Sequence, residues 1–213
     1  HTPTTPNNNK KTIIGLLVFL GFPYLLKFLK LDLMQFEAGM WVLLSLIILW
    51  ILFVEKRTLE SIGWKKITAK MTFVSIGLGL VIFVLFGAIT IAIQAIGLHL
   101  NKDVAELIAG QSIPVLLLIA LRAAVVEEVL YRGFAFERLY DLTKSKWLSA
   151  LVPVLLFTLI HMSWGVGHLL FVFVAGGIFM LMYIWKRNLP MIMIAHFVTD
   201  VIALLVLPLM LES

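Results

Sequence analysis

The sequence predicts an all-α protein that spans a membrane as a polytopic bundle of about seven helices. Hydrophobic residues make up 62% of the 213 residues and charged residues only 14%, against about 25% in soluble domains. The apolar residues form long runs, and helices pair every backbone group of such a run inside a bilayer. This composition excludes a disordered chain and argues against an ordinary soluble domain.

Seven apolar stretches approach the length of about 20 residues that a spanning helix needs. They lie at about 12–29, 39–54, 71–98, 113–136, 147–162, 166–185 and 189–211. The second and fifth are short, and the third is long enough to be tilted, to be broken near Gly87 or to contain an eighth segment. We expect residues 1–11 to form a flexible cytoplasmic tail and residues 12–213 to form a single transmembrane domain.

The basic residues between these stretches predict the orientation. Twelve of them lie in the N-terminal tail, the 55–70 loop, the 137–146 loop and the 186–188 turn, whereas three lie in the other connectors. Because cytoplasmic connectors are rich in Lys and Arg, we expect the N-terminus in the cytoplasm and the C-terminus outside. Charges spread along membrane edges also argue against nucleic-acid binding. The absence of cysteine excludes disulfides and thiolate sites.

A small set of ionisable residues falls inside the predicted spans. They are Arg122, Glu127, Glu128, Arg132, His161, His196 and Asp200. A charge at the centre of a spanning helix costs about 2.5–3.5 kcal/mol on insertion scales, so such residues face the bundle interior and mark functional sites.

In the fourth stretch, the i,i+4 spacing of Glu128 and Arg132 predicts an ion pair on one helix face. Glu127 points about 100° away at 3.6 residues per turn and has no cation at that spacing. This favours a structural Glu128–Arg132 pair and a chemically free Glu127. An inert ion network of all three residues stays open, and Arg122 lies nearer the outer end of the span, where snorkelling or an outside partner would satisfy it.

The fifth and seventh stretches each add an i,i+4 pair. Phe157 would shield His161 from water, and Asp200 would orient His196 or share a proton with it. Together with Glu127 these groups are suited to general acid–base chemistry on water. Two histidines and carboxylates are also zinc ligands, although the His-Glu-x-x-His pattern is absent.

Three motifs in this order resemble those of the CAAX protease and bacteriocin-processing family of intramembrane glutamic endopeptidases. They are Glu-Glu-x-x-x-Arg at Glu127–Arg132, Phe-x-x-x-His at Phe157–His161 and His-x-x-x-Asn/Asp at His196–Asp200. The resemblance covers residues 112–210. It points to the prokaryotic branch, related to prenyl-protein proteases, and hence to a prokaryotic plasma membrane.

The resemblance implies a hydrolase that uses no metal or other cofactor. Glu127 would activate water with the help of His161, and His196 with Asp200 would stabilise the oxyanion. Glu128 and Arg132 would support them, and Phe157 would form the pocket wall. The prenyl-protease branch usually has Asn at position 200, so Asp200 is a departure that weakens the assignment to prenylated peptides.

The sequence therefore predicts a metal-independent endopeptidase that acts on a membrane-associated or lipid-modified peptide or protein. The cavity is expected to open to the cytoplasm, because Glu127 is 11 residues from Arg138 and His196 is 9 residues from Arg187. The alternative is a non-catalytic immunity or chaperone-like membrane protein of the same family. A proton-coupled transporter is disfavoured because the sequence has no internal repeat. The oligomeric state and the natural substrate are not predicted.

Overall fold

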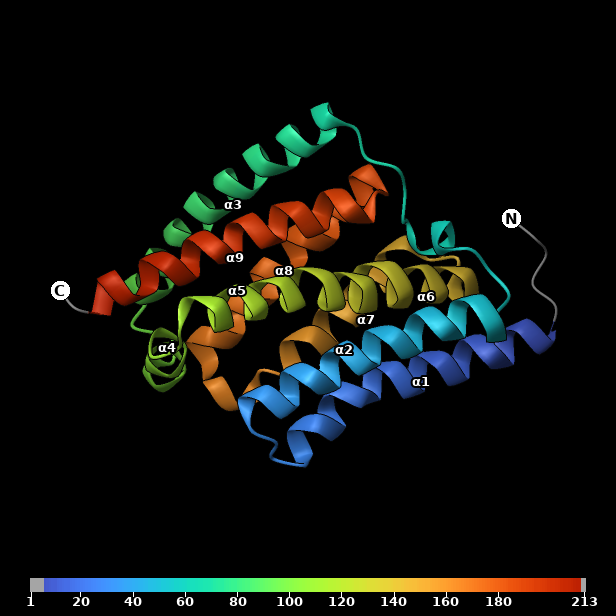
Figure 1. Cartoon of the computed structure of the whole chain (residues 1–213), viewed down its shortest axis with the longest axis horizontal. Helices are drawn as coiled ribbons and strands as arrows, with labels where there is room; N and C mark the ends of the chain where they lie inside the picture. Colours follow the sequence, from blue (N-terminus) through green and yellow to red (C-terminus); the bar gives the residue numbers. More distant parts are fainter. Residues whose placement is uncertain (1–5, 212–213) are drawn as a thin grey trace.

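The computed structural model describes residues 6–211, and the side chains of residues 9–205. The described residues form helices joined by turns and loops, and they contain no strand. Its α-helices are α1 (Pro6–Phe28), α2 (Leu33–Leu49), α3 (Ala69–Ala95), α4 (Lys102–Ala109), α5 (Ile113–Arg122), α6 (Phe136–Thr143), α7 (Lys146–Leu159), α8 (Val166–Lys186) and α9 (Leu189–Leu211). The bundle in Figure 1 thus confirms the predicted fold class.

Four helical segments within the described residues are long and apolar enough to cross a membrane. They are Asn9–Phe28, Leu33–Val54, Ala69–Ala95 and Val166–Lys186, and Lys146–Leu159 and Leu189–Leu205 are shorter apolar helices. The second segment combines α2 with the π-helical turn Trp50–Val54. Each of the seven apolar stretches therefore forms a helix over most of its length, although the third and fifth stretches run past the ends of α3 and α7.

The first two helices begin earlier than predicted. α1 starts at Pro6, so residues 6–11 of the expected tail are helical, and residues 1–5 of that tail lie outside the described residues. α2 starts at Leu33 because Asp32 caps it: the Asp32 side chain accepts from the Gln35 amide, and the Gln35 side chain accepts from the Asp32 amide. Hydrophobicity alone missed the polar first turn of α1, and in α2 the polar residues Gln35 and Glu37 interrupt the apolar run before residue 39.

The third stretch forms one helix, α3, which continues through Gly87 without the break considered above. Its backbone packs closely on α9, since a Cβ built on Gly79 would lie 2.7 Å from the Ala195 carbonyl oxygen. Figure 1 shows these two helices side by side. After α3 the chain forms the short helix α4, which the sequence analysis did not predict.

A single helical run from residue 113 to residue 143 forms the centre of the bundle. It consists of α5, a π-helical segment, Ala123–Ala135, and α6, and we call it the central helix. Eleven of the thirteen residues of the π-helical segment are buried. Because neighbouring helices cover this segment, its charged side chains must find partners inside the protein.

The basic connectors gather at one end of the bundle, as the predicted alternation of spans requires. Arg138 binds Glu55 and Ser61, with Nε 2.8 Å from Oε2 of Glu55. The Leu189 amide donates to the Gly63 carbonyl at 2.8 Å. These contacts join the 55–70 loop to α6 and to the start of α9. Arg138 is fully buried, so it does more than mark the membrane edge.

Candidate active site

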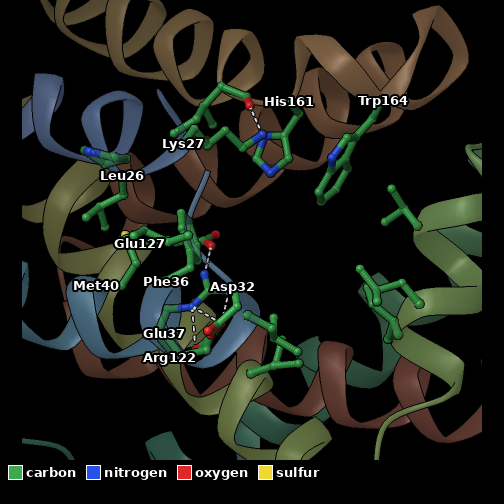
Figure 2. A pocket seen from close by; sticks show the side chains of 18 of the residues that line it. Leu26, Lys27, Asp32, Phe36, Glu37, Met40, Arg122, Glu127, His161 and Trp164 are labelled. Atoms are coloured by element: carbon green, nitrogen blue, oxygen red, sulfur yellow. Dashed lines mark hydrogen bonds and ion pairs between the residues drawn. The ribbon is translucent and has the colours of Figure 1, made fainter. Parts of the chain in front are cut away.

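A cavity of about 410 Å³ lies at the ends of α1, α2 and α7, beside α4 and the first half of the central helix. Its wall is mostly apolar and includes Leu26 and Met40. Three residues predicted for the site, Glu127, Phe157 and His161, line this cavity, and Figure 2 shows Glu127 and His161 facing it. An apolar cavity with a few convergent polar groups is the usual form of a small-molecule or peptide site.

Glu127 is held by an arginine in this structure. Nη1 of Arg122 donates to Oε1 of Glu127, and Nη2 of the same guanidinium lies 2.9 Å from Oε1 of Glu37. The i→i+5 hydrogen bonds of a π-helix bring residues five apart towards one face, which explains the contact between residues 122 and 127. The interpretation of Glu127 as free of any helical cation is therefore wrong, as is the snorkelling position considered for Arg122.

Glu37 is a site residue that the sequence analysis missed. Glu37 belongs to the neighbouring helix α2, and its side chain is 3% exposed. Its carboxylate pairs with Arg122 of the central helix. The predicted second stretch began at residue 39, which left Glu37 in a connector. The Asp32–Gln35 capping box carried the missing signal, because a helix that starts at Leu33 places Glu37 in its second turn.

His161 lies in the turn after α7 rather than within a spanning helix, since α7 ends at Leu159. Its Nδ1 is 2.8 Å from the Phe157 carbonyl oxygen. Because a carbonyl oxygen only accepts, Nδ1 carries the hydrogen and Nε2 keeps its lone pair. The ring lies between Phe157 and Trp164, with centroids 5.1 and 4.6 Å away. An acceptor nitrogen is thus fixed at the cavity wall.

Behind Glu127 lies a second group of polar residues. The Glu128–Arg132 pair that the spacing predicts is present, with 3.1 Å between Oε1 and Nη1 and side chains 0% and 1% exposed. Oε1 of Glu128 is also 2.8 Å from Nδ1 of His196, and Nε2 of His196 is 3.3 Å from Oδ2 of Asp200. Glu128 therefore orients His196 as well as pairing with Arg132.

The predicted convergence of four catalytic residues is only partial. Glu127 and His161 line the cavity, whereas His196 and Asp200 are absent from its wall. His196 stacks instead on Phe179, with ring centroids 4.5 Å apart. In the part of the chain that the structure describes, no three His, Asp or Glu side chains gather as a metal-ligating group.

The cavity opens at the end of the bundle away from the basic connectors. Its exposed lining residues include Lys30, Asp32 and Leu107, from the α1–α2 connector and α4, whereas its deeper residues Glu37 and Arg122 are buried. Figure 1 shows the α1–α2 connector at the opposite end of α1 from the N-terminus. A cytoplasmic opening and a cytoplasmic N-terminus, which we expected together, therefore exclude each other.

Comparison with protein families matches residues 109–202 to the family described as type II CAAX prenyl endopeptidase Rce1-like. The matched range contains all three motifs, and α1 to α4 lie outside it apart from the last residue of α4. No curated protein and no solved structure matches the chain. The family match confirms the resemblance, while the prokaryotic branch stays a prediction. Residues 109–202 of this chain, an integral membrane protein, are therefore similar to the Rce1-like CAAX protease family.

Proposed function

We propose that this protein is an intramembrane glutamic endopeptidase, in which Glu127 activates water without a metal ion. The observation that carries the proposal is the presence of Glu127 and His161 on the wall of one cavity. The family match supports peptide-bond hydrolysis in general. The described residues also supply a carboxylate base and an imidazole acceptor, which together suffice to hold and deprotonate one water.

In the proposed reaction Glu127 takes a proton from water while Nε2 of His161 holds that water. Arg122 contacts Oε1 of Glu127, and within the described residues no donor contacts Oε2, which leaves this oxygen to the water. The hydroxide oxygen attacks the carbonyl carbon of the substrate. The C–N bond then breaks, and the proton held by Glu127 passes to the leaving amine nitrogen.

The oxyanion role of His196 stays a proposal that requires a change of partner. Nδ1 of His196 is fixed by Glu128 at 2.8 Å, whereas Nε2 faces Asp200 at the longer distance of 3.3 Å. Nε2–H is therefore the donor that would move from Asp200 to the oxyanion. Asp200 would act as the orienting group, which an ionised carboxylate can do although it cannot itself donate a hydrogen bond.

The test is proteolysis by purified protein in detergent or proteoliposomes. The probes are an apolar transmembrane-segment peptide, a farnesylated C-terminal peptide and the same peptide without the lipid. We expect Glu127→Gln to lower kcat by about 10²–10⁴-fold, the usual contribution of a general base. The matched control is Glu60→Gln, an identical change at an exposed carboxylate. Undiminished cleavage by Glu127→Gln would remove Glu127 as the base.

A chelator separates the glutamic mechanism from a zinc mechanism. We expect full activity in EDTA, whereas strong inhibition that zinc reverses would contradict the metal-independent proposal. Comparison of the three probes assigns the substrate class. Preference for the farnesylated peptide would place the protein with the prenyl-protein proteases, despite Asp200.

One observation favours the alternative, a non-catalytic immunity or chaperone-like protein. Glu127, Arg122 and Glu37 form a charge-paired chain, which is also what an inert structural network would look like. Under this alternative none of the probes is cleaved, and Glu127→Gln lowers the melting temperature instead of the rate. Cleavage that Glu127→Gln abolishes, with an unchanged melting temperature, would exclude it.

A further inference from the structure

The cavity has one open end and one closed end. Exposure along its wall increases from the buried floor at Glu37 and Arg122 to Lys30 and Asp32 at the rim. Leu107 of α4, which is 59% exposed, also lies on that rim. A peptide therefore reaches Glu127 past the α1–α2 connector and α4.

The opposite end of the bundle is sealed by buried side chains. Arg138 is 0% exposed and binds Glu55, and its Nη2 donates to Ser61 Oγ at 2.9 Å. The Tyr183 hydroxyl donates to Glu137 at 2.7 Å, next to this cluster. None of these residues lines the cavity that contains Glu127, whose exposed rim lies at the other end of the bundle.

The charge of the two ends differs sharply. The sealed end carries twelve basic residues, from Lys10 to Arg187, and four acidic ones, so it has a net charge of about +8. Among the described residues, the open end carries three basic residues, which are Lys27, Lys30 and Lys102, and three acidic ones, which are Asp32, Asp103 and Glu106. The excess of Lys and Arg in short connectors sets the cytoplasmic side of a membrane protein.

We infer that the cavity opens on the non-cytoplasmic side of the membrane. This inference rests on the proposed function for its substrate class, which is then a peptide segment presented at the outer surface or within the outer half of the bilayer. The apolar wall around Leu26 and Met40 suits apolar side chains of such a segment. A cytoplasmic protein with a lipid-modified C-terminus would not reach Glu127 in this orientation.

Labelling of single cysteines tests the sidedness directly, because the chain contains no cysteine of its own. Ser163→Cys, an almost isosteric change in the exposed turn beside His161, reports on the open end. Lys66→Cys, at an exposed position in the 55–70 loop, reports on the sealed end. Each variant is treated with a membrane-impermeant maleimide, once in intact cells and once in inverted membrane vesicles.

We expect Ser163→Cys to be labelled in intact cells and Lys66→Cys only in inverted vesicles. The reverse pattern, or labelling of both positions in both preparations, would overturn the inference. Leu107→Cys on the rim replaces Ser163→Cys if the latter does not accumulate in the membrane. Because labelling needs no catalysis, an inactive protein still tests sidedness. Conversely, an active protein with the reverse labelling refutes the sidedness and leaves the proposed function intact.

Discussion

Removing the charge of Glu128 is expected to destabilise the protein strongly, because this carboxylate is the centre of the buried network. It is 0% exposed, and its Oε1 contacts Nη1 of Arg132 at 3.1 Å and Nδ1 of His196 at 2.8 Å. Breaking a buried ion pair from one side costs about 3–5 kcal/mol, since the partner stays buried and uncompensated. At about 2–4 °C per kcal/mol for a chain of this size, Glu128→Gln should lower the melting temperature by about 6–20 °C.

The assay is thermal unfolding of purified variants in one detergent. Glu60→Gln is the matched control, since the same change at an exposed position should alter stability by less than about 0.5 kcal/mol. A double-mutant cycle adds Arg132→Met and the variant that carries both changes. The double variant should lose less free energy of unfolding than the two single variants together, by about 0.5–3 kcal/mol. Additive losses, or equal melting temperatures for Glu128→Gln and Glu60→Gln, would refute the reasoning.

Two further predictions follow from contacts that only the folded chain reveals. Glu37→Gln should lower kcat about tenfold with little change in KM, because it loosens the arginine that positions Glu127; unchanged steady-state kinetics would contradict this. Gly167→Ala should lower the free energy of unfolding by about 1–3 kcal/mol, since its Cβ would lie 2.3 Å from the His99 carbonyl oxygen. The control is Gly177→Ala on the same helix, whose Cβ would meet nothing within 4 Å, so this change should be neutral or stabilising. Thermal unfolding of the two alanine variants compares them, and equal melting temperatures would disprove the close approach.

Local sequence patterns predicted the features that depend on a single helix or on the surrounding lipid bilayer. Long apolar runs predicted the bundle, and the i,i+4 spacing predicted the Glu128–Arg132 pair, which forms although both residues lie in the π-helical segment. The same rule failed at Glu127. The π-helical segment Ala123–Ala135 also brings Arg122, five residues earlier, to the Glu127 carboxylate, while it keeps the Glu128–Arg132 pair.

The division of the site into two groups could not be predicted from spacing. Whether His196 faces the cavity or Glu128 depends on the rotation of α9 against the central helix, which packing decides. The partner of Arg122 was equally hidden, since Glu37 is 85 residues away in the sequence. Contacts between helices depend on how the helices dock, and no periodicity within one helix encodes that docking.

The sequence alone thus determined that the protein lies in a lipid bilayer, that its fold is all-helical and which ionisable residues are available to the site. Apolar runs require a bilayer, and the few ionisable residues within them mark its interior wherever the helices pack. Only the tertiary structure decided which of these residues share a cavity and towards which end it opens. Charge counts predict the orientation of the helices, but the end of the bundle at which Glu127 and His161 share a cavity depends on how side chains from several helices pack.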